Sequence, residues 1–149
     1  MNTDIKDLIP LIVADVYELA GRFREQGEAI AAAVGQTQAR WQVMSAASAD
    51  PRTVPQIARR LGVSRQNVQR IADLLVKENW ANFADNPDHK GSPYLVLNAR
   101  GDAALAKITK AAGSSHAHLA RRLAGTDVGA LHRGLRRLIQ TLNDRDNPK

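Results

Sequence analysis

Apolar residues recur at three- and four-residue spacing near both ends of the chain, which predicts a long amphipathic helix at each end. The first runs from residue 5 to about residue 33. Pro10 either kinks this helix or marks its true start, and Gly35 stands at the C-cap position. The last helix spans residues 128–142, and its apolar face consists of Leu131, Leu135, Leu138, Ile139 and Leu142.

Three shorter helices are predicted in the middle of the chain. One runs from Thr37 to about residue 47, and its expected core residues are Trp41, Val43, Met44 and Ala47. After a turn at residues 50–51, the next begins at Thr53, whose hydroxyl can form a capping box with Gln56. The third runs from Ser64 to about residue 78, and Asn79 follows in the place of a left-handed C-cap.

Residues 80–98 have a different pattern. Residues 80–83 and 94–97 are strand-like and flank a turn-rich insert at residues 85–93, which together predict a β-hairpin. Asn98 can cap a further helix to about residue 112, where residues 113–115 interrupt or bend it. The fold class expected is mainly α with one small β-hairpin (α+β).

Residues 54–73 have the pattern of a helix-turn-helix. Ala58 is small where the second helix crosses the first, Gly62 permits a conformation that a Cβ opposes, and Ser64 caps the second helix. The apolar positions expected to pack the two helices together are Ile57, Leu61, Val63, Val68 and Ile71. An ordinary helical hairpin with a glycine turn is the alternative interpretation.

The outward face of the second helix suits a DNA major groove. Its residues are Arg65, Gln66, Asn67, Gln69 and Arg70, and the sequence has no acid before Asp73 on this helix. Arginine bonds guanine bidentately, and glutamine or asparagine does so with adenine. We expect Gln66, Asn67 and Arg70 to contact base edges. Ser64 and Arg65 are expected mainly at the DNA backbone or in mixed contacts.

The hairpin that follows would complete a winged helix-turn-helix. Its tip carries His89 and Lys90, with Asn86 and Ser92 nearby. Basic tips of this kind reach the minor groove or its phosphates. Many hairpin tips are polar, so polarity alone does not indicate a DNA contact. The position of this hairpin directly after the second helix strengthens that interpretation.

Charge and composition agree with an anionic partner. The chain of 149 residues has a net charge of +6, with residues 1–51 at −3, residues 52–100 at +4 and residues 101–149 at +5. A merely solubilising basic surface is the alternative. The absence of cysteine excludes disulfides and thiolate sites, and the lack of a long apolar run or basic leader favours a cytoplasmic protein.

These motifs resemble the MarR (multiple antibiotic resistance regulator) family. The matching stretches are residues 37–44, the helix-turn-helix, and the wing at residues 85–93 running into residues 96–101. The resemblance covers residues 35–112. It implies a triangular homodimer with interleaved first and last helices and two winged lobes on successive major grooves of a near-palindrome. It also implies a repressor released by phenolic or lipophilic anions that bind between the dimerisation helices and the lobe.

Three departures from the family pattern limit what carries over. The wing tip has Lys90 where arginine is usual, which keeps the charge but loses the fork geometry. The cysteine of the oxidation-sensing branch is missing. His116 and His118 lie two positions apart, which on a helix points them to different sides, so we expect no metal site and no cofactor.

The two ends of the chain have more apolar surface than one winged lobe can bury. The positions concerned are Ile5, Leu8, Ile9, Ile12, Val16, Leu131, Leu135, Leu138 and Leu142. A two-fold interface between chains would cover them, although packing within one chain is the alternative. We therefore expect residues 1–34 and 101–149 to serve dimerisation and residues 35–100 to form the DNA-binding lobe.

An effector pocket is the least determined feature. Its candidate residues are Tyr17, Arg24, Trp41 and Met44, because aromatic and soft side chains beside one cation suit a small aromatic or lipophilic acid. For Trp41 and Met44, a plain core position is the commoner interpretation. The family analogy carries most of this hypothesis.

Taken together, the sequence predicts a sequence-specific regulator that binds double-stranded DNA as a homodimer. A non-specific or architectural DNA binder with the same lobe is the alternative. An enzyme is not expected, because the sequence has no nucleophile elbow, no phosphate-binding glycine loop and no metal-ligand cluster. The operator, the regulated genes, the effector and the sign of regulation cannot be derived from the residues.

Overall fold

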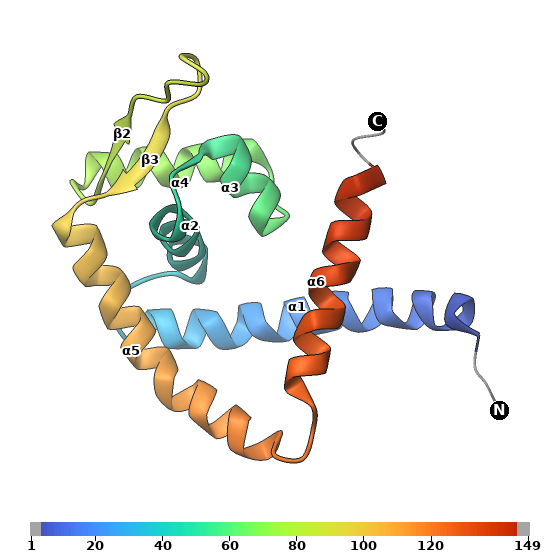
Figure 1. Cartoon of the computed structure of the whole chain (residues 1–149). Helices are drawn as coiled ribbons and strands as arrows, with labels where there is room; N and C mark the ends of the chain where they lie inside the picture. The colour runs from blue at the N-terminus through green and yellow to red at the C-terminus, as the bar shows by residue number, and fades with distance from the viewer. Residues whose placement is uncertain (1–3, 146–149) are drawn as a thin grey trace. The chain divides into compact units, whose positions relative to one another are not determined.

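The chain forms a mainly helical structure with one small sheet. The computed structural model describes residues 4–145, and the chain divides into two compact units at residues 1–113 and 114–149. The elements are α1 (Ile5–Ala32), α2 (Gln38–Ala49), β1 (Arg52–Thr53), α3 (Val54–Leu61), α4 (Arg65–Lys77), β2 (Ala81–Ala84), β3 (Tyr94–Leu97), α5 (Ala99–Arg122) and α6 (Val128–Arg145). Within the first unit, α2 lies between α1 and the α3–α4 pair, and the β2–β3 hairpin extends beyond α4 (Figure 1).

The junction of α1 and α2 is built from local hydrogen bonds. Gly35 takes a left-handed conformation with φ of 73°, which ends α1 as predicted. The Thr37 side chain accepts from the Arg40 amide at 3.2 Å. Glu28 of α1 accepts from the Gln38 amide at 3.1 Å, so α1 itself supplies a second cap for α2. The start of α2 is thereby fixed against α1.

The sheet holds the wing to the helix-turn-helix. Its strand order is β1-β3-β2, and both pairs are antiparallel. β1, which the sequence pattern did not predict, pairs Arg52 with Leu95 and Thr53 with Tyr94. Thr53 also caps α3 in the predicted capping box with Gln56. One residue therefore ends a strand and begins a helix.

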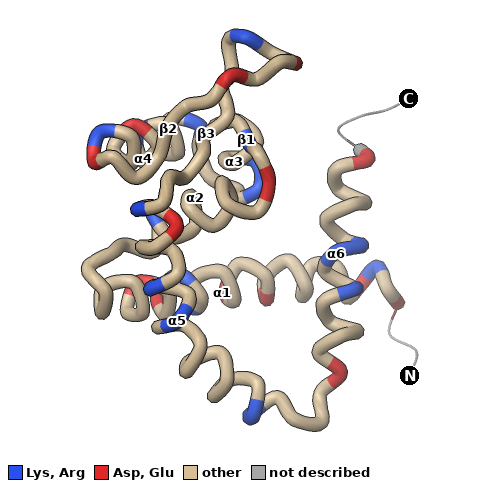
Figure 2. Tube along the Cα trace, turned by 60° about the vertical axis from the view of Figure 1, so that its left-hand side comes forward, with Lys and Arg blue, Asp and Glu red and all other residues tan. Residues whose placement is uncertain are grey.

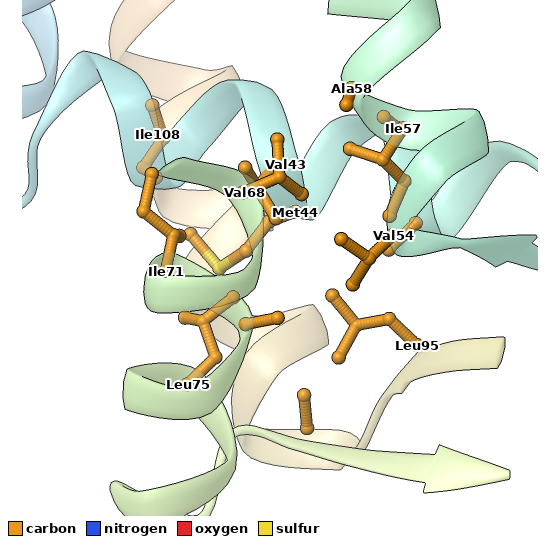
Figure 3. Close-up of a cluster of buried hydrophobic side chains, with 14 residues drawn as sticks. Val43, Met44, Val54, Ile57, Ala58, Val68, Ile71, Leu75, Leu95 and Ile108 are labelled. Carbon is orange, nitrogen blue, oxygen red and sulfur yellow. The ribbon is translucent and has the colours of Figure 1, made fainter. Parts of the chain in front are cut away.

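One apolar core fills the described part of the first unit, residues 4–113. Figure 3 shows side chains from α2, α3, α4, β3 and α5 pointing into the same space. The largest fully buried side chains are Val43, Met44, Ile57, Val68, Leu75, Leu95 and Ile108. Trp41 packs against this core but is only half-buried. The core fixes one face of α4, so the other face is free to meet a partner.

Two details of the helices exclude one of the alternatives that the sequence left open. α1 begins at Ile5, so Pro10 lies inside it and does not mark its start. Residues 113–115 do not interrupt α5, which continues as helix to Arg122, and a bend at these residues stays a prediction. A glycine in an exposed helix costs about 1 kcal/mol, which a helix of this length tolerates.

The second unit contains the end of α5 and all of α6. A turn with Gly125 at φ of 93° separates the two helices, and the Asp127 side chain accepts from the Ala130 amide at 2.8 Å to cap α6. The exposed large apolar residues of α6 are Val128, Leu131, Ile139 and Leu142. Across residues 4–145, no helix has the length and apolarity that a membrane span needs. The expected division into residues 1–34, 35–100 and 101–149 concerns roles and stays a prediction.

Candidate nucleic-acid interface

The turn between α3 and α4 has the geometry that the sequence predicted. Gly62 adopts a left-handed φ of 66°, and the Val63 amide donates to the Ala58 carbonyl at 3.1 Å. The Ser64 hydroxyl accepts from the Asn67 amide at 3.1 Å and caps α4. These bonds fix the angle at which α4 leaves the turn.

The expected packing role of Val63 was wrong. Its side chain is 43% exposed and does not seal the junction between the helices. Instead it lines a cavity that α1 and α2 also border.

The two faces of α4 separate as a recognition helix requires. Val68, Ile71, Ala72 and Leu75 are buried. The exposed residues include Ser64, Arg65, Gln66, Gln69 and Arg70, whereas Asn67 is half-buried. Of the six contact residues expected in α4 and at its N-cap, five are therefore exposed and one is half-buried.

A groove of about 740 Å³ runs between α4 and the hairpin. The α4 side brings together Arg65, Gln66, Gln69, Arg70 and Asp73. The lining also includes Phe83 from β2, residues 91–93 from the loop, and Val54 and Pro55 from α3. The groove thus joins the recognition helix and the wing in one concave surface.

The wing loop is organised by Asn86, which is buried. Its Nδ2 donates to the Ser92 carbonyl at 3.0 Å, and its Oδ1 accepts from the Asp88 amide at 3.0 Å. The His89 amide donates to the Asn86 carbonyl at 3.2 Å. His89 and Lys90 are exposed at the end of this ordered loop. A fixed loop presents its charge without a further ordering cost.

Basic side chains of the groove and wing keep their charges available. Figure 2 shows basic and acidic positions interspersed on α4 and on the wing loop. Among the ion pairs of the described residues, none engages Arg65, Arg70 or Lys90. Their positive charge is therefore open to an anionic partner.

Two side-chain hydrogen bonds order the open face of α4. The Gln69 amide nitrogen donates to Asp73 Oδ1 at 2.9 Å. Arg70 Nη2 donates to Asn67 Oδ1 at 3.1 Å. Both pairs follow the spacing at which helix side chains meet, so the polar groups are partly oriented before any partner binds.

The effector candidates do not gather at one place. Arg24 lines the cavity of about 370 Å³ that Val63 borders, together with apolar side chains of α1, α2 and α4. Tyr17 is 77% exposed, and Met44 is fully buried in the core. Trp41 lies beside Gly27, where an added Cβ would be 3.7 Å from its ring. Of the four, Arg24 is the one that borders this cavity among the described residues.

The sequence reasoning gave no groove role to Asp73 and Phe83, and it placed Asn86 near the wing tip without predicting its burial. Asp73 lies four positions after Gln69, and this spacing could have revealed their contact. Phe83 is exposed in β2, but a strand of four residues gives too little pattern to assign its face. Asn86 has no local signal for burial, because polar loop residues are usually exposed.

The described part of the chain offers no metal centre. No group of three or more histidine, aspartate or glutamate side chains gathers within residues 4–145. His116 and His118 are both exposed on α5. Nothing in their surroundings brings further ligands to them among these residues.

A helix-turn-helix followed by a β-hairpin, with a basic groove between recognition helix and wing, defines a winged-helix DNA-binding transcription regulator. Residues 35–90 match the model of the MarR family. The chain is 47% identical over 138 residues to the uncharacterized protein Rv2011c of Mycobacterium tuberculosis, covering 93% of this chain and 96% of that protein. The chain belongs to the MarR family of transcription regulators, as the resemblance implied.

Solved structures show the same fold. The transcriptional repressor CouR bound to a 23-mer DNA duplex has a TM-score of 0.65 and 23% identity, covering 95% of this chain and 99% of that one. A mutant of MarR from E. coli complexed with operator DNA has a TM-score of 0.67 and 21% identity, covering 91% and 99%. At these identities the likeness concerns the fold.

Proposed function

We propose that this protein is a sequence-specific regulator that binds a palindromic operator as a homodimer and represses transcription until a small anion releases it. The observation that carries the proposal is the groove that joins the exposed face of α4 to the wing loop. The groove is concave, its arginines form no ion pair among residues 4–145, and the wing loop is ordered. These features suit the sugar-phosphate backbone of a DNA duplex. A regulator of this kind acts where the DNA is, in the cytoplasm.

Each side chain of the interface has a distinct role in this proposal. Gln66, Asn67 and Arg70 read base edges in the major groove. The half-buried position of Asn67 limits its reach, and its bond to Arg70 gives it a share in orienting that guanidinium. Gln69 faces the same groove.

The remaining contacts position the protein on the duplex. Ser64 and Arg65 stand at the start of α4, where backbone amides and a partial positive charge attract a phosphate. His89 and Lys90 reach from the wing toward the minor groove or its phosphates. These contacts contribute affinity for any sequence.

Dimerisation is supported by the apolar surface that each unit leaves open. In α1, large apolar side chains between 38% and 76% exposed include Ile5, Leu8, Ile9, Ile12 and Val16. In α6, Leu131 and Leu142 are both more than half exposed. A second copy of the chain would cover these surfaces, and two-fold pairing matches a palindromic site.

An effector has one supported position. The cavity of about 370 Å³ is mainly apolar, and Arg24 supplies a cation at its border. Such a site suits a carboxylate on an aromatic or lipophilic body. Tyr17, Trp41 and Met44 would need a rearranged or dimeric structure to take part. Calorimetry with salicylate, compared between the wild type and Arg24→Ala, tests this part of the proposal.

Selection of bound fragments from genomic DNA tests the main proposal. The expected result is enrichment of fragments that share a two-fold symmetric sequence, protected in footprints at two adjacent major grooves. Transcription from a promoter that contains this sequence should fall when the protein is added. Uniform recovery of fragments would instead indicate a non-specific or architectural binder.

A further inference from the structure

One carboxylate stands in the groove that is proposed to take the DNA. Asp73 lines this groove together with Arg65, Gln66, Gln69 and Arg70, and its side chain is exposed. A negative charge at this position repels phosphates and lowers affinity for every sequence. Its presence therefore needs a reason other than attraction to DNA.

The bond between Gln69 and Asp73 supplies that reason. Gln69 Nε2 lies 2.9 Å from Asp73 Oδ1. An ionised carboxylate only accepts hydrogen bonds, so the atom of the Gln69 amide that faces it must be the nitrogen. Without such a neighbour, the nitrogen and oxygen of an exposed glutamine exchange places freely. Asp73 thus fixes which way round the amide is presented.

The fixed Gln69 amide still has one donor and one acceptor available for a base. Each amide nitrogen has two hydrogens, and Asp73 takes one of them. Among residues 4–145, the other N–H and the Oε1 atom of Gln69 have no hydrogen-bond partner. An N–H beside a carbonyl oxygen is the pair that bonds adenine at N7 and N6.

We propose that Asp73 is a positioning residue that makes Gln69 an adenine reader, at the cost of weaker binding to all DNA. The inference rests on the proposed function, because it assigns part of the sequence preference of the same groove. The Asp73 side chain then has two separate effects on DNA binding. The charge of Asp73 acts on every sequence, whereas its hydrogen bond acts at a single base pair in each half-site.

Selection from a pool of random duplexes, followed by binding titrations, tests the inference. The variants are Gln69→Ala, Asp73→Ala and the double variant. Gln69→Ala identifies the base pair that Gln69 reads. Asp73→Ala should lower the adenine preference at that same base pair about tenfold. It should also tighten binding to random DNA.

The double variant shows whether the two residues act together. In the Gln69→Ala background, Asp73→Ala should change base preference no further but should still tighten binding to random DNA. Asp73→Asn removes the charge and offers both a donor and an acceptor, so the Gln69 amide can turn over. We expect this variant also to lose adenine preference, which a pure charge effect would not produce.

Asp102→Asn is the matched control. Asp102 is an exposed acid in the first turn of α5, within the same compact unit and outside the groove lining. Its substitution changes the net charge as Asp73→Asn does, and it should leave the base preference unchanged. Circular dichroism and thermal unfolding of each variant establish that the exposed substitutions leave the lobe folded.

Two outcomes would overturn the inference, and they differ in what else they overturn. If the wild type selects a shared sequence and Asp73→Ala reads it with the same adenine preference, the inference alone fails. If the wild type enriches no shared sequence, the proposed sequence-specific function fails and the inference fails with it.

Discussion

The guanidinium of Arg40 donates to both carboxylate oxygens of Glu78, with 3.0 Å between Nη1 and Oε1. It also lies 4.8 Å from the centre of the Trp80 ring. Arg40 belongs to the first turn of α2, and Glu78 directly follows α4. The pair therefore joins the helix at the centre of the lobe to the end of the recognition helix, next to the start of the wing.

Breaking this ion pair should make stability less dependent on pH. The hydrogen bond from Arg40 holds the pKa of Glu78 below its usual value. The stabilisation is fully present above the unfolded pKa of about 4.3 and is lost as pH falls through the lower folded pKa. Urea unfolding at neutral pH should show Glu78→Gln to be less stable by about 1 kcal/mol. The difference should vanish in acid.

Glu18→Gln provides the control for that measurement. Glu18 pairs with Arg22 at 3.5 Å on α1, and both side chains are about 70% exposed. An exposed pair of this kind contributes little. A loss from Glu18→Gln as large as that from Glu78→Gln would contradict the role assigned to the Arg40 contact.

Arg70→Ala and Lys90→Ala should affect DNA binding differently. Arg70 faces the groove from α4, so its loss should reduce preference for the operator over random DNA, by about tenfold. Lys90 stands on the wing, so its loss should weaken binding to all sequences and lower the slope of affinity against salt by about one unit. Titrations at several salt concentrations measure both. An equal loss on operator and random DNA for Arg70→Ala would contradict the role of Arg70, and a loss confined to the operator for Lys90→Ala would contradict the role of Lys90.

Gly101→Ala should unfold the lobe at lower denaturant concentration. A Cβ at this position would lie 2.2 Å from the Trp80 carbonyl oxygen, so helix α5 and the chain before β2 would have to separate. We expect a loss of about 3 kcal/mol. Gly113→Ala in the same helix is the control. An added Cβ there meets nothing within 4 Å, so this variant should gain up to about 1 kcal/mol.

Asn86→Ala should weaken DNA binding through the shape of the wing. The substitution removes the bonds to the Ser92 carbonyl and the Asp88 amide, and the loop must then pay for ordering when it binds. Asn82→Ala is the control, since Asn82 is exposed on β2 and lies outside the groove lining. Gel-shift titrations should show a several-fold loss for the first variant and little for the second. Equal affinities would show that the wing loop orders itself by other means.

Leu142→Asp should dissociate the proposed dimer. Leu142 is 54% exposed on α6, where a second chain would cover it. A carboxylate buried at an apolar interface costs several kcal/mol, so sedimentation should show monomers at concentrations at which the wild type is dimeric. Gln140→Asp adds the same charge to an exposed polar position of α6. The Gln140→Asp variant should remain dimeric. If both variants were monomeric, the cause would be the added charge in general and not the position of Leu142.

The helix-turn-helix was the part of the fold that local chemistry determined best. Capping by Thr53 and Ser64 and the left-handed residues Gly62 and Asn79 each depend on neighbours close in sequence, and each is present. β1 escaped prediction because it has two residues and depends on a partner strand about 40 residues away.

In the candidate site, too, the features that depend on neighbours close in sequence were predictable, and those that depend on distant contacts were not. The exposed face of α4 follows from helical spacing, since the core requires the opposite face. The burial of Asn86 and the exposure of Val63 depend on contacts that no local pattern encodes. The apolar, flexible side chain of Met44 suits an effector pocket as well as a core. Its contacts in the folded structure place it in the core.

Strand β1 links the wing to the helix-turn-helix. Because Thr53 belongs to the sheet and also starts α3, the hairpin cannot swing independently of the helix-turn-helix. The wing and the recognition helix are therefore held at a fixed spacing. A duplex whose major and minor grooves do not match this spacing has to twist or bend before the helix and the wing can both contact it. We therefore expect selectivity to extend to base pairs that no side chain touches, through the stiffness of the DNA itself.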